Sequence, residues 1–232
     1  MKTSSPSAKN PQCPVIAIDG PSASGKGTVA ALAAQALGFH YLDSGAIYRV
    51  TAHAARISGV SLEDEAGLAE MARGLNLRFE GGEVFLDSHP VGDAIRSEAA
   101  GRDASRIAAL PQLRLALLER QRAFRISPGL VSDGRDMGSV VFPDAALKIF
   151  LTASAEERAQ RRYKQLIEKG FDANLAELLR DLQERDARDA ARSSAPLRQS
   201  ADAVLLDTTS MNIQQAVQQV LDWWRECNVA SC

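Results

Sequence analysis

The chain has few of the residues that characterise secreted, zinc-binding or membrane-spanning proteins. It contains three cysteines among 232 residues, Cys13, Cys227 and Cys232, all near the ends of the sequence. An odd number of cysteines without metal-ligand spacing argues against a disulfide framework and favours the reducing cytoplasm. The sequence holds no run of the roughly 18 apolar residues that a membrane helix needs. Residues 1–13 are polar, without an apolar signal-peptide core, and predict a disordered leader.

The chain has almost no excess of positive or negative charge, and it has few lysines. The formal net charge is −2, and only six of the 27 basic residues are lysines. A nearly neutral chain argues against nucleic acid or a membrane surface as partner. Arginine is suited to forked contacts with phosphate and carboxylate, although a genomic bias toward arginine explains the same excess.

Alternation of apolar segments with helical patterns predicts the fold. Five short apolar runs read as buried strands, and the segments between them read as helices. This order predicts an α/β fold with a five-stranded, doubly wound parallel sheet, whose ligands lie at the carboxyl ends of the strands. The predicted strands are 15–19, 39–42, 130–132, 146–151 and 204–206, and the predicted helices are 28–37, 46–57, 62–73, 111–125, 154 to a break at 170, 175–192 and 213–227.

The pattern changes to period two between residues about 60 and 100. Residues 75–79 and 84–86 alternate on either side of Gly81 and Gly82, which predicts a hairpin, and 89–91 add a third short strand. The sequence therefore predicts an insertion that carries its own small antiparallel sheet.

A glycine-rich turn joins the first predicted strand to the first helix. It matches G-x-x-x-x-G-K, except that Gly27 stands where a hydroxyl residue is usual and Thr28 follows it. Small residues let backbone N–H groups surround phosphate oxygens at a helix N-terminus, and Lys26 adds a positive charge. The alternative is a glycine-rich turn without a ligand. The predicted phosphate-binding residues are Gly20, Pro21, Ser22, Ala23, Ser24, Gly25, Lys26, Gly27 and Thr28.

Three further motifs follow in order: LDSGAIYR at 42–49, SDGRDMG at 132–138 and ERDARDAAR at 184–192. Together with the G-K-G-T turn, they resemble the bacterial cytidylate kinases, nucleoside monophosphate kinases of the P-loop class, from about residue 15 to 225. The resemblance implies phosphoryl transfer from ATP, with Mg²⁺, to CMP or dCMP. It also implies a core of 14–45, 107–157 and 176–228, a nucleotide-binding insertion of 46–106 and a short helical lid of 158–175.

The same resemblance assigns the acceptor-binding residues. Arg49, Arg135 and Arg192 hold the acceptor phosphate; Ser105, Arg114 and Asp136 read the base; Arg185 and Asp189 contact the sugar; Ser44, Tyr48 and Asp133 also line the site. Two alternatives remain open on spacing alone. Arg114 also fits a solvated helix face, and the 185–192 arginines fit a ladder of ion pairs along a helix.

The lid and the magnesium ion complete the implied site. Arg158, Arg161 and Arg162 share one helix face and would close on ATP, unless they form a solvated basic face. Asp19, Asp43 and Asp133 fall at or just after strand ends and would face one cleft. The ion would be held by phosphates and water, with no direct protein ligand; Asp133 would help through water, or would instead fix Arg135 or Arg49.

Two other functions compete with this interpretation. One is a P-loop kinase for another nucleotide or a small metabolite. The other is a nucleotide-dependent regulator, but a GTP switch needs a guanine-reading [NT]-K-x-D, and none of the six lysines lies in one. The apolar face of the last helix is accounted for by the core, so we expect a monomer.

Overall fold

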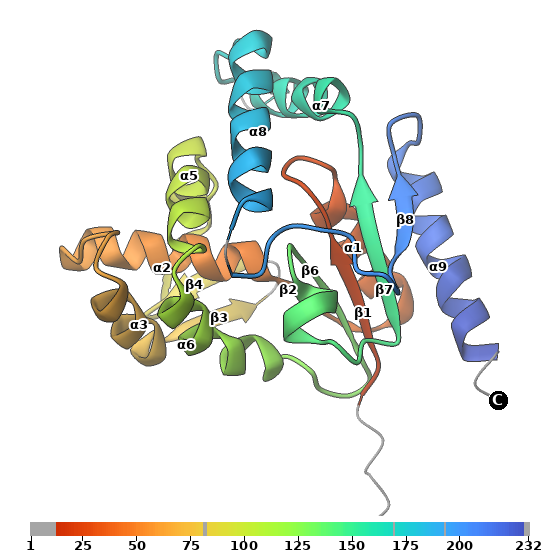
Figure 1. Cartoon of the computed structure of the whole chain (residues 1–232), viewed down its shortest axis with the longest axis horizontal. Coiled ribbons are helices and arrows are strands. Elements are labelled where there is room, and N and C mark those ends of the chain that lie inside the picture. Colours follow the sequence, from red (N-terminus) through yellow and green to blue (C-terminus); the bar gives the residue numbers. More distant parts are fainter. Residues whose placement is uncertain (1–12, 81–82, 169, 193, 230–232) are drawn as a thin grey trace, which may run out of the picture.

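A parallel five-stranded sheet with the strand order β2-β6-β1-β7-β8 forms the centre of the molecule (Figure 1). The computed structural model describes residues 13–80, 83–168, 170–192 and 194–229. The predicted fold class is therefore confirmed. In chain order the elements are β1 (Val15–Asp19), α1 (Lys26–Leu37), β2 (His40–Asp43), α2 (Ser44–Ser58), α3 (Glu65–Gly74), β3 (Leu77–Glu80), β4 (Glu83–Leu86), β5 (His89–Pro90), α4 (Gly92–Ile95), α5 (Glu98–Ile107), α6 (Pro111–Arg122), β6 (Leu130–Gly134), the π-helical turn η1 (Met137–Val141), β7 (Leu147–Thr152), α7 (Ala155–Glu168), α8 (Leu175–Ala190), β8 (Val204–Asp207) and α9 (Ile213–Val229).

Both faces of the sheet are buried, which explains why β1 is apolar almost throughout. Ile16 and Ile18 pack with α1 and α9 on one face, and Val15 and Ala17 pack with α2 and α6 on the other. Parallel strands covered on two sides read as continuous apolar runs because they have no solvent face. In Figure 1 the arrowheads of β7 and β8 point toward α7 and α8, so the carboxyl ends of the strands face these helices.

The insertion has the predicted antiparallel sheet, β3-β4-β5. Val84 and Leu86 of β4 lie on a small apolar cluster with Ala46 and Val50 of α2, so the insertion is attached through its own core. The predicted turn at 81–82 lies outside the described residues. Helix α5, which the sequence analysis did not predict, packs against α2 and α8.

Helices α7 and α8 form a hairpin over the sheet (Figure 1). Ser154 caps α7, because the backbone N–H of Glu157 donates to Ser154 Oγ at 3.2 Å. The Glu157 carboxylate does not return this contact: it accepts from Arg161, and the Ser154 amide donates to Thr209. The predicted end of α8 is wrong: the helix ends at Ala190, and Arg192 lies in the segment that follows. Within the described ranges, the helices are all too short or too polar to cross a membrane.

Candidate active site

Residues 20–28, the donor loop, connect β1 to α1 in a shape that side chains would prevent. A Cβ on Gly20 would lie 1.9 Å from the carbonyl oxygen of Leu151, and Gly25 has a φ of +89°. Both positions therefore require glycine. The hydroxyl of Ser24 is buried and has no hydrogen-bond partner within the described part of the chain. An anion at the N-terminus of α1 would satisfy this hydroxyl and the helix dipole together.

Lys26 lies beside a buried carboxylate at the carboxyl ends of β2 and β6. Its Nζ is 3.8 Å from Asp133 Oδ2, and the Tyr41 hydroxyl donates to Asp133 Oδ1 at 2.7 Å. Burial lowers the pKa of Lys26, and burial together with Asp43 raises the pKa of Asp133. Asp133 thus pairs with Lys26, and the described residues show no ion pair of Asp133 with Arg135 or Arg49. Its help to magnesium stays a prediction. Tyr41 was not predicted; its only signal is its place just before the LDSGAIYR motif.

The other two strand-end carboxylates, those of Asp43 and Asp19, accept hydrogen bonds from backbone amides. Asp43 accepts from the amide of Ala46 at 2.9 Å and caps α2. Asp19 accepts from the amides of Met137 and Gly138. Only Asp133 of these three therefore contacts a charged group of the donor loop.

A cavity of about 210 Å³, the acceptor pocket, extends from the donor loop to α6. Every residue that the sequence analysis assigned to the acceptor lines it, although they come from segments more than 140 positions apart. The lining includes Lys26, Ser44, Tyr48, Arg49, Ser105, Arg114, Asp133, Arg135, Asp136, Arg185, Asp189 and Arg192.

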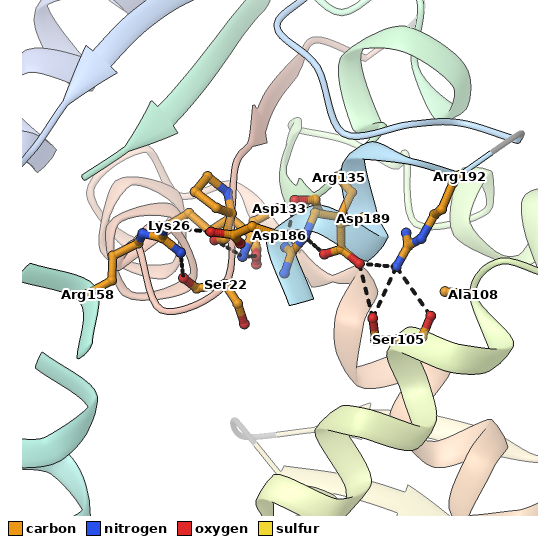
Figure 2. A network of polar contacts seen from close by, with 12 residues as sticks. Ser22, Lys26, Ser105, Ala108, Asp133, Arg135, Arg158, Asp186, Asp189 and Arg192 are labelled. Carbon is orange, nitrogen blue, oxygen red and sulfur yellow. Dashed lines mark hydrogen bonds and ion pairs between the residues drawn. The ribbon is translucent and has the colours of Figure 1, made fainter. Parts of the chain in front are cut away.

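Asp189 organises two arginines in the middle of the acceptor pocket. Its carboxylate accepts from Arg135 Nε at 2.8 Å, from Ser105 Oγ at 3.0 Å and from Arg192 Nη2 (Figure 2). Burial raises the pKa of Asp189, but Arg135 and Arg192 outweigh burial and hold it below its usual value. Oδ2 accepts from Arg135 alone, so it keeps capacity for a further hydrogen bond.

Arg114 and Asp136 form an ion pair at the far end of the pocket. Arg114 Nη1 also lies 3.4 Å from the Tyr48 hydroxyl and 3.2 Å from the carbonyl oxygen of Ala108. The side chain of Arg114 is only 10% exposed, so it does not belong to a solvated helix face. Burial raises the pKa of Asp136, against the effect of Arg114. The pair offers a donor fork beside a carboxylate, the pattern that hydrogen-bonds a base edge.

Arg185 also lines the acceptor pocket, and its side chain lacks a full set of hydrogen-bond partners among the described residues. Its Nε is buried and has no hydrogen-bond partner among the described residues. Burial and the neighbouring Arg135 lower its pKa to about 10. A guanidinium whose pKa is lowered by other cations lies in a site that an anion would stabilise.

Two of the lid arginines contact the donor loop directly. Arg158 donates to the Ser22 carbonyl at 3.0 Å and to Asp186 of α8 at 2.6 Å (Figure 2). Arg161 donates to the Ser24 carbonyl at 3.2 Å. The side chains of Arg158 and Arg161 are 6% and 26% exposed, so they do not form a solvated basic face.

Arg162 points the other way, toward the insertion. Its Nε donates to Glu98 Oε1 in the first turn of α5 at 2.6 Å. This ion pair lies at a second cavity of about 520 Å³, between α5 and α8, which Arg49 and Arg185 also line. Arg162 therefore links α7 to α5.

A third cavity of about 660 Å³ lies on the opposite side of the donor loop. Thr208, Met211, Asn212 and Ile213 line it, together with the donor loop and Arg161. The segment after β8 was not predicted as part of the site, and it carries no motif that would have indicated it. The donor loop thus separates two cavities, one on the side of the acceptor pocket and one on the side of α9.

The comparisons with known proteins agree with this arrangement. The family model for cytidylate kinase matches residues 16–226. A cytidylate kinase of Chromobacterium violaceum is 61% identical over 213 residues, covering 92% of this chain and 96% of that protein. One from Bordetella bronchiseptica is 59% identical over 219 residues, covering 94% and 98%.

Similarity to solved structures is more distant. An uncharacterized protein from Eubacterium ventriosum ATCC 27560 gives a TM-score of 0.48 at 12% identity, covering 90% of this chain and 97% of that one. Such a score bears on neither fold nor function. The family model and the two curated relatives span nearly the whole chain, and the phosphate loop and the arginine-lined pocket lie within the matched residues. The chain therefore belongs to the cytidylate kinase family.

Proposed function

We propose that this enzyme transfers the γ-phosphoryl group of ATP to CMP or dCMP, giving ADP and CDP or dCDP. The observation that carries the proposal is the acceptor pocket. It has a phosphate loop with Lys26 at one end and a buried Arg114–Asp136 pair at the other, with arginines between them. A nucleoside monophosphate has its phosphate and its base in the same order. The family membership supports the same substrate.

ATP would lie across the donor loop. Its base and ribose fit the 660 Å³ cavity beside Met211 and Ile213, and its phosphates reach the amides of the loop and Lys26. A bound Mg²⁺ would neutralise phosphate charge, with its ligands drawn mainly from phosphates and water, and Asp133 is placed to orient such a water. The Ser24 hydroxyl, which has no hydrogen-bond partner among the described residues, would donate to a phosphate oxygen. The positive charges of Lys26 and of the arginines of α7 would likewise suit a polyphosphate.

The acceptor phosphate would be held by Arg49, Arg135 and Arg192. Asp189 fixes two of these arginines with hydrogen bonds. Arg135 also donates to the Gly134 carbonyl and Arg192 to Ser105, so the phosphate would take the N–H groups that these bonds leave free. Arg185, whose Nε is unpartnered, is the better candidate for the sugar or the bridging oxygens than Asp189. The acceptor phosphate is already anionic, so the chemistry needs positioning and charge neutralisation rather than a general base.

Base choice follows from the polarity of Arg114 and Asp136. Cytosine presents acceptors at O2 and N3 and an amino donor at N4, so arginine donates to it and the carboxylate accepts from it. Uracil presents N3–H and O4 at those positions. The N–H donors of Arg114 would then face the N3–H donor, and the Asp136 carboxylate would face the O4 acceptor. A buried mismatch of this kind costs about 1–3 kcal/mol for each group.

The arginines of α7 would complete the site when both substrates are bound. Arg158 and Arg161 already contact the donor loop, whereas Arg162 is held by Glu98 and would have to change partner to reach phosphate. Such a change would follow movement of the lid (158–175) and the insertion (46–106) toward the core. Closure would exclude water, which otherwise competes as acceptor.

A coupled ADP-release assay tests the proposal. CMP, dCMP, UMP, AMP and GMP are offered separately with ATP and Mg²⁺, to the wild type and to Asp136→Ala. We expect fast turnover with CMP and dCMP, slow turnover with UMP, and a smaller CMP-over-UMP ratio for Asp136→Ala. ADP release that no monophosphate accelerates would contradict the proposal and point to another acceptor.

A further inference from the structure

The carboxylate of Asp19 has no part in the roles proposed above, yet both of its oxygens are engaged. It ends β1 and is 8% exposed. Oδ1 accepts from the amide of Met137 at 2.8 Å, and Oδ2 accepts from the amide of Gly138 at 2.9 Å. These amides begin the turn η1, and they directly follow Arg135 and Asp136.

The first amides of a helical turn lack partners inside the turn, and the residue just before it normally satisfies them. In η1 that residue is Asp136, and aspartate is among the best capping residues. Its side chain makes no capping hydrogen bond and is paired with Arg114 instead. Asp19, 118 positions earlier in the chain, therefore performs the capping that Asp136 does not.

The backbone around this contact leaves little room for adjustment. The amide of Gly20, the first residue of the donor loop, donates to the Gly134 carbonyl at 3.3 Å. A Cβ on Gly134 would lie 2.5 Å from Ser44 Oγ. The end of β1 and the turn after β6 are thus held against each other at adjacent positions of two paired strands.

We propose that Asp19 is a positioning residue for base selection, because by capping η1 it keeps the Asp136 carboxylate turned toward Arg114 and the base. This role rests on the proposed function of the pocket. Without the cap, the nearest carboxylate that could satisfy the orphaned amides is that of Asp136 itself. Asp136 would then turn back onto its own turn and leave the base edge without its acceptor.

The burial of Asp19 is consistent with this role. Burial raises its pKa to about 7, and the hydrogen bonds from Gly138 and Met137 oppose that rise. The ionised form accepts at both oxygens, whereas the protonated form has only one good acceptor for two amides.

The test is Asp19→Asn, which keeps the shape but replaces one acceptor with an N–H donor. We expect the CMP-over-UMP ratio of kcat/KM to fall about tenfold, mainly through a higher KM for CMP, while KM for ATP changes less than about threefold. Asp64→Asn is the matched control. Asp64 also caps a helix, α3, through the amide of Gly67 at 2.9 Å, but it is exposed and lines none of the three cavities.

A merely structural role would lower stability and activity with every substrate and leave the ratio intact, as Asp64→Asn is expected to do. An unchanged ratio in Asp19→Asn would therefore overturn the assignment. A wild type without preference for CMP would instead contradict the proposed function. If Asp19→Asn does not fold, Asp19→Glu keeps the charge with one more methylene and should lower the ratio in the same direction. Failure of both variants to fold would show a structural role and overturn the proposal as well.

Discussion

The donor loop and the acceptor pocket, which we propose to bind phosphate, are built by different means. The donor loop is a single run of nine residues, 20–28, and its shape is imposed by glycines and by the start of α1. The acceptor pocket takes its side chains from α2, α5, α6, α8, the turn after β6 and the segment after α8. Two of its arginines, Arg135 and Arg192, are held by the side chain of Asp189.

This difference determines how each region responds to change. In the proposed function, the donor loop would surround phosphate with backbone N–H groups. Most of its side chains should then be replaceable where there is space, with Lys26 as the exception. In the acceptor pocket each side chain positions another. Removal of one leaves a buried charge without its partner, which is more costly than the loss of the bond alone.

The largest effect should come from Lys26, the donor-loop side chain that we expect not to be replaceable. Lys26→Ala removes the only lysine among the described residues that line the acceptor pocket, and with it the charge that we place beside the transferring phosphoryl group. We expect kcat to fall about 10³-fold in the ADP-release assay, since single charged contacts to a transition state are of that magnitude. The substitution removes a cation that burial disfavours, but it leaves the buried Asp133 carboxylate without its ion-pair partner, so the free energy of unfolding should fall moderately. A fall in stability without a fall in kcat would contradict its role in phosphoryl transfer.

The sequence predicted the donor region more fully than the acceptor region. Strand β1, the glycine-rich turn and α1 are consecutive, so local pattern was sufficient to place them. The acceptor residues were found through the resemblance and not through their spacing. Arg185 to Arg192 on spacing alone read as a ladder of ion pairs. The structure has two such pairs, Arg192–Asp189 and Arg188–Glu184. Asp189 also pairs with Arg135, 54 positions away, which spacing could not reveal.

Features that depend on distant partners were missed. Helix α5 was missed although its buried residues, Gly101, Ala104, Ser105 and Ile107, lie on one face. It supplies Ser105 and Glu98 to two cavities. Turn η1 owes its cap to Asp19, which no local pattern reveals. The segment 208–213 faces the donor loop only because β8 lies beside β7.

The second-largest effect should come from the centre of the acceptor pocket. Asp189→Asn keeps the shape but removes the charge between Arg135 and Arg192, which are 15% and 6% exposed. We expect the free energy of unfolding, measured by urea denaturation, to fall by about 3 kcal/mol, as for other broken buried pairs. Both arginines should then bind CMP in the wrong orientation, and kcat should fall about 100-fold.

An exposed ion pair serves as the control for this variant. Asp222 pairs with Arg225 one turn along α9 and is 45% exposed, so Asp222→Asn should change stability by less than about 0.5 kcal/mol. Equal losses of stability in Asp189→Asn and Asp222→Asn would mean that the side chains of the acceptor pocket depend on one another no more than an exposed ion pair does. The contrast between the acceptor pocket and the donor loop would then be wrong.

A smaller effect is expected where the lid meets the insertion. Glu98→Gln removes the carboxylate that holds Arg162, so Arg162 becomes available to phosphate at lower cost. We expect KM for ATP to fall about threefold, a size typical of partly exposed ion pairs. Glu70→Gln, which breaks the exposed Glu70–Arg73 pair of α3, is the control and should leave KM unchanged. A higher KM in Glu98→Gln would show that the pair stabilises the ATP-bound form instead.

The smallest effect should come from a side chain of the donor loop itself. Ser24 is 1% exposed and its hydroxyl has no partner among the described residues, so Ser24→Ala removes a buried polar atom without breaking a hydrogen bond. We expect thermal stability without ligand to stay the same or to rise slightly. Stabilisation by ATP should decrease, with Kd rising about threefold, if the hydroxyl donates to a phosphate oxygen. Thr51→Val is the control, because it loses a buried hydroxyl bonded to Ile47 within α2 and should weaken stability but not ATP binding. The opposite result, lower stability with unchanged ATP affinity, would mean that the donor loop also depends on side-chain bonds, as the acceptor pocket does.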